Sequence, residues 1–558
     1  MKTTRIVAIA LTILLLPVFY LAAMPEGEAA APAEMMEITW IGETSIGEAG
    51  SVPEDSWVGQ QLKQKFPDVR IIPVNVDQWN VDLLKILVSS GDMPDFGYYD
   101  RLQGETWNFY KDGATRSVPN AMIREHAPNM SKWYDDRPPA WLLNVVPGAD
   151  EKYALAGLKD YKLGVMYLPF FRYDWLEKIG MQPPSVIDLE PDKDPGRYLW
   201  AQHRYSLDEL EAILIAFRDE DLDGNGKDDT VPWALDQRFT RWRSLHEMFG
   251  LVWEWNIEEN GETVLAPVSE AAKEYLKLMQ KWYEMKLVNA DFPNVTSEQV
   301  RAFMHEGIAG VSTGAYSHLG IRAEQDAKWP QALLANHPEG KLVMTDPFMG
   351  PAAFNSGASS SVQSSSWLFN TIVAERVSDE KLAKCLEIWD YLNGTLEGHV
   401  MAIYGEPGVH FNWAGEPMNS YAQRLPLSTA EGMGGQEGFR FYQGGNHWPI
   451  EWMIYRDPPE FRALIDYYRD SAPPFTLYMH REDLFGETDY LNARKRYAGD
   501  LETILAEFFY NAMTGQIDID AEWDNYVETY MGAGGAEVLA EIRKAPLVSG
   551  LRQGEKIY

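Results

Sequence analysis

Hydrophobic side chains near the start of the chain change their period four times, and this alternation constrains the fold more than any other feature. Three apolar runs typical of strands, at 36–42, 68–76 and 96–99, alternate with two segments, 55–66 and 79–90, whose apolar side chains recur every three or four residues. A βαβαβ order predicts an α/β protein with a mainly parallel, doubly wound sheet. The second helical segment is expected to bury Leu83, Leu84, Leu87 and Val88.

The chain is too long for a single compact core. It has 558 residues, and chains of this length normally divide into two or more domains, each with its own core. It contains no internal repeat and no low-complexity linker. We therefore expect lobes joined by short crossover segments, with irregular segments after about residue 405 and a helical C-terminal portion.

The charge balance excludes two classes of partner. The formal net charge is -34 at pH 7. Nucleic acids and anionic membrane surfaces both require clustered Lys and Arg, so neither is expected as the main partner. A basic pocket for an acidic small molecule stays open, because net charge does not describe a single cleft.

The N-terminal sequence resembles a secretory signal. Lys2 and Arg5 precede an apolar run that begins at Ile6, and small residues follow. Cleavage is expected between Ala23 and Ala33, so that residues 1–33 form the signal peptide and the mature protein is periplasmic or extracellular. The segment has no Cys, which argues against a lipoprotein; an uncleaved membrane anchor is the alternative. The single cysteine, Cys385, is expected to lie in the core, so no intramolecular disulfide can form.

The segment "DLDGNGKDD" has the spacing of a calcium-binding loop. Counting from Asp221, oxygen-bearing side chains fall at positions 1, 3, 5 and 9, a glycine falls at position 6, and the residue at position 7 can offer its backbone carbonyl. The bidentate Glu of an EF-hand is replaced by Pro232, which argues against a conformational sensor. We predict structural Ca²⁺; the alternative is a solvated acidic turn without metal. The predicted metal ligands are Asp221, Asp223, Asn225, Lys227 and Asp229.

Several short motifs suggest enzymes but lack the partners that catalysis requires. "GVSTG" places Ser312 in a nucleophile-elbow pattern, although five-residue matches are frequent by chance. "HEMFG" and "HEGIAG" begin like zinc-protease helices, but Gly250 and Ala309 replace the second His. A pair of catalytic carboxylates cannot be excluded from sequence, because only their separation in space is diagnostic. A secreted glycoside hydrolase is therefore the alternative function.

Aromatic residues are abundant and often stand beside polar ones. The chain has 20 Trp and 28 Tyr, in segments such as "YYDR", "RFTRW" and "GNHWP". Sugars present flat C–H faces surrounded by hydroxyl groups, which suit an aromatic side chain with hydrogen-bonding neighbours. This pattern favours a carbohydrate ligand, although amphipathic packing at the lobe surfaces would also explain any single aromatic.

The order of several motifs resembles the extracellular solute-binding proteins of ABC importers, family 1, a maltose-binding-like group. "ILVSSGDMPDFGYY" is similar to its "ASGD-x-PD" segment, and "FRYDWLEKIGMQPPSV" is similar to a segment of the subgroup that includes alginate-oligosaccharide binders. The calcium-loop pattern follows at the place expected for that subgroup. "FMHEGIAGV", "DPFMGPAAF" and "EWDNYV" extend the resemblance over nearly the whole mature chain.

This resemblance implies a two-lobe, Venus-flytrap fold that encloses its ligand and performs no catalysis. The N-terminal lobe would comprise 34–118 and 346–408, and the C-terminal lobe 119–345 and 409–558, including the calcium loop. The implied cargo is an oligosaccharide, although peptide cargo stays conceivable, and the implied partner is an ABC permease. The protein would be a monomer. A calcium-stabilised adhesin without an enclosed site is a further alternative.

The resemblance also implies a set of ligand-binding residues on the loops that follow strands. Where the family usually has Trp, this chain often has Tyr or Phe, so the identity of the sugar does not transfer. The expected residues, together with two from "GNHWP", are Glu43, Tyr98, Tyr99, Asp100, Arg101, Lys159, Asp160, Gln237, Phe239, Trp242, Tyr316, His447 and Trp448.

Overall fold

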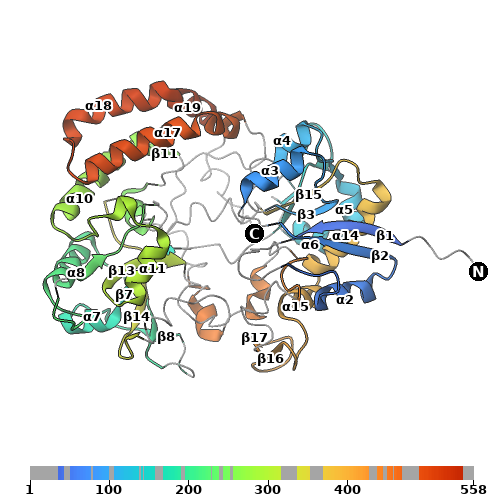
Figure 1. Cartoon of the computed structure of the whole chain (residues 1–558), viewed down its shortest axis with the longest axis horizontal. Helices are drawn as coiled ribbons and strands as arrows, with labels where there is room; N and C mark the ends of the chain where they lie inside the picture. The colour runs from blue at the N-terminus through green and yellow to red at the C-terminus, as the bar shows by residue number, and fades with distance from the viewer. Residues whose placement is uncertain are drawn as a thin grey trace, which may run out of the picture.

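The computed structural model of the chain consists of two α/β units side by side (Figure 1). We call residues 35–157 and 369–455 the first unit, and residues 167–351 and 458–544 the second unit. The structure describes residues 35–42, 51–76, 80–99, 106–136, 140–141, 144–157, 167–189, 191, 195–227, 229–237, 243–251, 256–315, 333, 336–351, 369–425, 437–443, 449–455, 458–464, 466–467 and 489–544.

The first unit is built on a five-stranded sheet with the order β2-β1-β3-β15-β6. β1 pairs in parallel with β2 and β3, whereas β15 is antiparallel to both β3 and β6. The predicted βαβαβ order is therefore confirmed. The strands are β1 (Met36–Ile41), β2 (Val69–Val74), β3 (Phe96–Tyr98), β6 (Leu155–Gly157) and β15 (Phe369–Val373).

Helices cover this sheet and extend the first unit well beyond its first hundred residues. They are α2 (Trp57–Lys65), α3 (Val81–Ser89), α4 (Thr106–Lys111), α5 (Asn120–His126), α6 (Pro128–Asp135), α14 (Asp379–Gly394) and α15 (Leu396–Tyr404). Smaller elements are β4 (Val118–Pro119), β5 (Glu151–Lys152), β16 (Phe411–Trp413), β17 (Ala422–Arg424) and the 3-10 helix η10 (Ile450–Tyr455). The expected lobe boundaries at residues 118 and 408 thus fall inside this unit, because β6, α5 and α6 share its core and η10 packs on α15.

The second unit is built on a six-stranded sheet with the order β10-β13-β7-β14-β9-β8. β10 is parallel to β13 and β14 is parallel to β9, while β7 runs antiparallel between β13 and β14. The strands are β7 (Tyr167–Arg172), β8 (Ile187–Asp188), β9 (Tyr198–Ala201), β10 (Val231–Trp233), β13 (Ala309–Ala315) and β14 (Leu342–Thr345), with a separate hairpin of β11 (Asn256–Glu259) and β12 (Glu262–Leu265).

Both faces of the second sheet are buried. The neighbouring residues Phe170 and Phe171 point to opposite faces and belong to different apolar clusters. The face of Phe171 is covered mainly by helices, which include the amphipathic helix α10, whereas α11 (Ser297–His305) packs on the face of Phe170. The elements on the face of Phe171 include α7 (Tyr173–Ile179), α8 (Leu207–Asp219), α9 (Arg243–His246), η5 (Glu247–Phe249), η6 (Ala266–Val268), α10 (Glu270–Glu284) and η7 (Phe292–Asn294).

The predicted helical C-terminal portion forms a layer over the second unit, at the top left of Figure 1. It consists of α17 (Asp489–Met513), α18 (Ile519–Tyr530), the π-helical turn η11 (Met531–Gly535) and α19 (Ala536–Ile542). Phe508 and Tyr526 stack with ring centroids 4.0 Å apart, and the Tyr526 hydroxyl donates to the Pro267 carbonyl at 3.1 Å. The layer is therefore an integral part of the second unit's core.

Among the described residues, the chain passes from one unit to the other three times, and two of these passages are short. The first joins Gly157, at the end of β6, to Tyr167, at the start of β7; ten extended residues span at most about 35 Å. The second runs from the end of β14 to the start of β15. The third is the shortest, because Tyr455 packs in the first unit and Phe461 in the second, at most about 20 Å apart along the chain.

The first two passages join corresponding edges of the sheets. β6 runs parallel to β3, and β7 starts where β13 and β14 end, so the first passage connects the carboxyl edge of one sheet to that of the other. The passage from β14 to β15 connects the same two edges. The carboxyl edges, where parallel sheets bind ligands, are thus joined by two passages of the chain.

Some expected side-chain positions differ from the observed ones. On α3, Leu84 and Val88 are buried as expected, but Leu83 is 44% exposed. It is wrong to place Leu83 on the buried face, because a two-turn helix on a sheet buries a single stripe, and residues 83 and 84 lie about 100° apart. Cys385 is buried in α14, as expected. No helix in the described part of the chain has the length and apolarity that spanning a bilayer requires.

We predict that the pH dependence of stability contains a contribution from His399. This side chain is fully buried in α15, and burial, followed by the nearby Arg440 charge, lowers the pKa of His399 to about 3. Because the unfolded chain binds a proton near pH 6.5 and the folded chain does not, stability is complete above that pH and falls as the pH decreases toward 3. The difference is on the order of 2 kcal/mol at pH 5.

Chemical denaturation of the wild type and of His399→Gln at pH 7 and pH 5 measures this contribution. The variant cannot take up the proton, so it should lose less stability between the two pH values than the wild type. Equal losses in both proteins would contradict the assignment.

Candidate functional site

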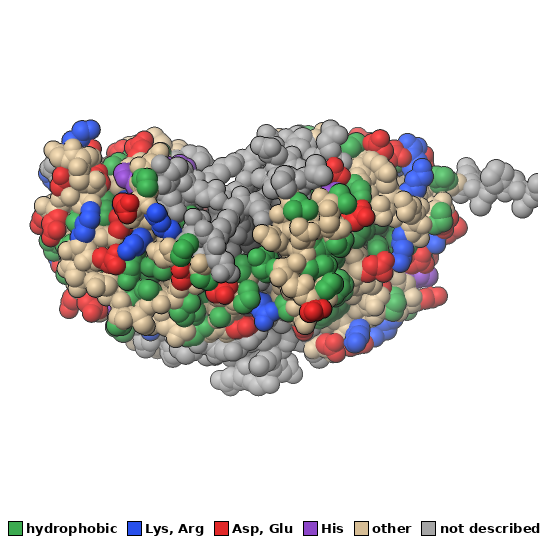
Figure 2. All heavy atoms as spheres, turned by 90° about the horizontal axis from the view of Figure 1, so that it is seen from below, with side chains coloured by type: hydrophobic (Ala, Val, Ile, Leu, Met, Phe, Trp, Pro, Cys, Tyr) green, Lys and Arg blue, Asp and Glu red, His purple; other side chains and the backbone are tan. Residues whose placement is uncertain are grey.

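The candidate ligand site lies where the carboxyl edges of the two sheets approach each other. Figure 2 shows the two units as adjoining bodies, each with charged side chains of both signs across its surface. Of the expected ligand-binding residues, the structure describes Tyr98, Tyr99 and Gln237. The others lie outside the described residues: Glu43, Asp100, Arg101, Lys159, Asp160, Phe239, Trp242, Tyr316, His447 and Trp448.

Tyr98 ends β3 at the carboxyl edge of the first sheet, and Tyr99 directly follows it. Their side chains are only 2% and 0% exposed. Burial raises the pKa of the Tyr99 phenol far above its ordinary value, so this hydroxyl stays protonated. Among the described residues, no hydrogen-bond partner reaches the Tyr99 hydroxyl. In this conformation, neither ring presents an open face to solvent.

Asp95 fixes the start of β3 to its neighbours. The Thr39 backbone N–H donates to Asp95 Oδ2 at 3.0 Å, and the Asp95 backbone N–H donates to Thr39 Oγ1 at 2.8 Å. The carboxylate also pairs with Arg376 at 2.9 Å and Lys381 at 3.3 Å, although it is only 4% exposed. The acidic residue of the "MPDFGYY" segment therefore positions the strand that carries both tyrosines.

Gln237 follows β10 at the carboxyl edge of the second sheet. Its side chain is exposed, while its backbone is held on both sides. The Gln237 N–H donates to the Val295 carbonyl at 2.7 Å, and the Tyr510 hydroxyl donates to the Gln237 carbonyl at 2.7 Å. This arrangement presents an amide side chain to solvent from a rigid support.

The same edge carries a polar cluster that sequence reasoning missed, and we call Arg204, Asp346 and Tyr467 the edge cluster. Asp346 directly follows β14, and Arg204 follows the adjacent parallel strand β9. Asp346 is 3% exposed and accepts a hydrogen bond from the Tyr467 hydroxyl at 3.0 Å. Asp346 could have been found from the sequence, because it directly follows an apolar strand. Tyr467 could not, because it stands in no recognisable motif.

Arg204 holds the two strand ends of the edge cluster together. Its Nε donates to the Pro347 carbonyl at 2.9 Å and one terminal nitrogen donates to the Phe348 carbonyl at 3.1 Å. Burial lowers the pKa of Arg204, and the Asp346 charge opposes that shift. Burial and the Asp346 charge raise the pKa of the Tyr467 phenol, which keeps the hydroxyl protonated as a donor.

The acidic loop has a defined internal geometry. Gly224 and Gly226 both have φ of 74°, a left-handed conformation that disfavours other residues. The backbone N–H groups of Asn225 and Gly226 donate to the two oxygens of Asp221 at 3.1 and 2.9 Å. The Asn225 side-chain amide donates to Asp223 at 2.7 Å and to Asp229 at 2.9 Å. Three carboxylates therefore converge around one asparagine.

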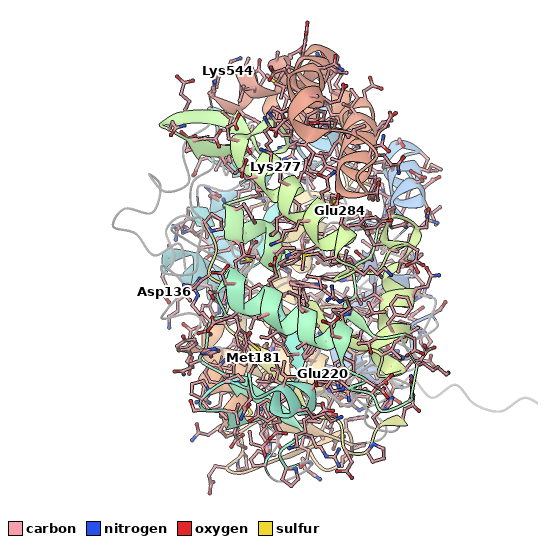
Figure 3. The ribbon with its side chains drawn as sticks, turned by 90° about the vertical axis from the view of Figure 1, so that its left-hand side faces the viewer. Asp136, Met181, Glu220, Lys277, Glu284 and Lys544 are labelled. Atoms are coloured by element: carbon pink, nitrogen blue, oxygen red, sulfur yellow. The ribbon has the colours of Figure 1, made fainter. Side chains whose placement is uncertain are left out.

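This convergence affects the acidity of the loop. Burial, reinforced by the neighbouring Asp229 and Asp221, raises the pKa of Asp223, while the hydrogen bond with Asp223 lowers the pKa of Asp221. In the described residues, no group of three His, Cys, Asp or Glu side chains is already arranged around a metal position. Glu220, which precedes the loop at the end of α8, lies on the side of the second unit that faces away from the first (Figure 3).

The enzyme motifs do not form catalytic arrangements in the described residues. Ser312 lies inside β13 and is 4% exposed, so "GVSTG" is a strand and not a strand-to-helix elbow. His246 ends α9 and is followed by the short 3-10 helix η5. His305 ends α11, immediately before the turn into β13.

Comparison with known proteins supports the fold. No protein-family profile matches the chain. A polygalacturonan/rhamnogalacturonan-binding protein, YtcQ of Bacillus subtilis, is 21% identical over 67% of this chain and 66% of its own length. A fructooligosaccharide ABC transporter substrate-binding protein, FusA of Streptococcus pneumoniae, is 24% identical over 33% of this chain and 31% of its own length. The chain thus matches less than two thirds of the length of either relative.

Solved structures match over a much larger share. A solute-binding protein of Bifidobacterium longum infantis, described as HMO-binding and associated with an ABC transporter, has a TM-score of 0.70, covering 92% of this chain and 98% of its own at 16% identity. A FusA EF-hand mutant of S. pneumoniae in complex with fructo-nystose has a TM-score of 0.67 and 16% identity, with coverages of 91% and 98%. The alginate-binding protein AlgQ2, solved without calcium ion, has a TM-score of 0.63 and 17% identity, with coverages of 92% and 98%.

The chain therefore has the two-unit α/β fold of the solute-binding proteins of ABC transporters. The solved structures named above are binding proteins, and none is an enzyme.

We predict that Asp95 contributes more to stability than an exposed ion pair does. Asp95→Asn keeps the shape of the side chain but removes the charge that Arg376 and Lys381 face, and should lower the free energy of unfolding by about 1–3 kcal/mol. The control is Glu397→Gln, which removes an ion pair to Lys65 whose side chains are 71% and 47% exposed, and should cost less than about 1 kcal/mol. Urea unfolding of both variants tests this, and equal costs would contradict the anchoring role of Asp95.

Proposed function

We propose that the protein is the substrate-binding component of an ABC importer and captures an oligosaccharide between its two units. The observation that carries this proposal is that two passages of the chain, one of them short, join the carboxyl edge of one sheet to that of the other. The relatives named as binders of polygalacturonan, rhamnogalacturonan and fructooligosaccharide support a carbohydrate ligand.

The proposed mechanism is a closing clamp. The two units act as lobes, made of residues 35–157 with 369–455 and of residues 167–351 with 458–544. The sugar first contacts one carboxyl edge, and closure then brings the other edge onto it. Closure follows ligand binding only if the ligand prefers the closed arrangement, since equal affinity for both would shift nothing. The expected ligand-binding residues would supply aromatic faces and polar contacts, without covalent chemistry.

The proposed setting is outside the cytoplasmic membrane. A signal peptide over residues 1–33 would direct export, and the closed, loaded protein would dock on a membrane permease. We propose that it works as a monomer, because one chain contains both halves of the clamp.

Thermal denaturation against a panel of oligosaccharides tests the proposed function. The panel contains fructooligosaccharides, human-milk oligosaccharides, alginate oligomers and oligogalacturonates. At least one should raise the melting temperature in a saturable way, and mass spectrometry should recover it intact after long incubation. Cleavage of the ligand at catalytic protein concentrations would support a glycoside hydrolase, and no response to any oligosaccharide would overturn the proposal.

We propose in addition that the acidic loop binds structural Ca²⁺. Asp221, Asp223 and Asp229 offer hard carboxylate oxygens, Asn225 an amide oxygen and Lys227 a backbone carbonyl, a donor set that suits Ca²⁺. The raised pKa of Asp223 supports the fit, because it reflects the partial burial of Asp223 and its repulsion by Asp221 and Asp229, which a cation would relieve. Two similar proteins, AlgQ2 solved without calcium ion and FusA solved as an EF-hand mutant, also support it.

Metal removal tests this second proposal. Ca²⁺ at about 100 times its dissociation constant should stabilise the protein by about 2.7 kcal/mol, and chelator should reverse the shift in melting temperature. Asp223→Asn should abolish the response to Ca²⁺. Glu220→Gln, next to the loop but outside the donor set, is the matched control and should keep it. A melting temperature that Ca²⁺ and chelator leave unchanged would contradict a calcium site.

A further inference from the structure

The edge cluster places an aromatic ring, a carboxylate and a guanidinium together at the edge where the second unit approaches the first. Asp346 stands at the carboxyl end of β14, from which the chain leaves for the first unit. Tyr467 follows the third passage by only a few residues, since Phe461 is the first core residue after it. Two passages between the units therefore begin or end beside this cluster.

The ring of Tyr467 is fixed at two points. Its hydroxyl donates to Asp346 Oδ2 at 3.0 Å, and its ring contacts the buried Trp200 at a centroid distance of 5.3 Å and an interplanar angle of 61°. Trp200 belongs to β9, so both contacts come from the sheet itself. Tyr467 nevertheless keeps part of its surface exposed. A rigid, partly exposed ring binds a flat partner with little loss of side-chain freedom.

The charges around the ring offset each other. Arg204 is an electrostatic neighbour of both Asp346 and Tyr467, and its guanidinium also donates to two backbone carbonyls. One carboxylate and one guanidinium leave the cluster without net charge. Within these three residues there is no excess positive charge to attract the carboxylate of a uronate, and their polar groups suit the hydroxyl groups of an uncharged sugar.

We propose that Tyr467 is a stacking platform for an uncharged sugar ring, that Asp346 and Trp200 are its positioning residues, and that Arg204 borders the same subsite. This proposal rests on the proposed function and names one subsite of it. The C–H face of the sugar packs on the tyrosine ring, and its hydroxyl groups meet the polar side chains beside it. The subsite lies on the second unit, so it is available before the units close.

Calorimetric titration tests the platform with the neutral oligosaccharide that gives the largest thermal shift. Tyr467→Leu removes the ring and should weaken binding at least tenfold. The matched control is Tyr173→Leu, a partly buried tyrosine that directly follows β7 at the opposite end of the same sheet, and it should leave the affinity unchanged. Circular dichroism and the melting temperature of each variant show whether it is folded.

Two milder variants separate a positioning role from a general loss of stability. Tyr467→Phe and Asp346→Asn should each weaken binding a few-fold, because each loosens the same hydroxyl contact. The double variant should be no weaker than the weaker single one, since both act through one hydrogen bond. Losses that multiply in the double variant would overturn the positioning role of Asp346.

The possible failures are distinguishable. If the wild type binds no oligosaccharide, the proposed function fails and the platform with it. If the wild type binds and folded Tyr467→Leu binds equally well, the platform alone is overturned. If Tyr467→Leu weakens an oligogalacturonate but no neutral oligosaccharide, the assignment to an uncharged sugar is overturned.

Discussion

The rest of the structure depends on the covalent passages between two sheets, two of which are short. Each sheet has its own buried core. The passages from β6 to β7 and from β14 to β15 begin and end at carboxyl edges, so they bring together the two edges at which α/β sheets bind ligands. A third passage, between Tyr455 and Phe461, limits the separation further.

Charged side chains that tie the strands of each sheet together explain how few residues can define a site. In the first unit, Asp95 ties β3 to β1 and α14; in the second, Arg204 ties the ends of β9 and β14. Both are charged side chains, and most of their hydrogen bonds join them to backbone groups or to side chains of opposite charge. Such buried contacts cost stability when broken but fix strand ends to which loops are attached. The acidic loop lies away from this gap, which agrees with a structural and not a ligand-binding role for Ca²⁺.

Local secondary structure could be predicted from the sequence, whereas the pairing of strands distant in sequence could not. The strands and helices of residues 36–98 and the burial of Cys385 follow from hydrophobic period alone. The insertion of β15 between β3 and β6 joins residues more than two hundred positions apart, and no local pattern encodes it. For the same reason the role of Tyr467 could not be predicted, because its partners Asp346 and Trp200 are distant in sequence. Tyr98 and Tyr99 were readable as strand-end residues, but their burial depends on packing that only the fold provides.

Small-angle X-ray scattering, with and without a saturating oligosaccharide that stabilises the protein, tests the central claim most directly. Two units hinged by short passages should close over the ligand, so the radius of gyration should decrease on binding while the mass stays that of one chain. A bound ligand that leaves the scattering profile unchanged would contradict a clamp and would favour a rigid body with a surface site.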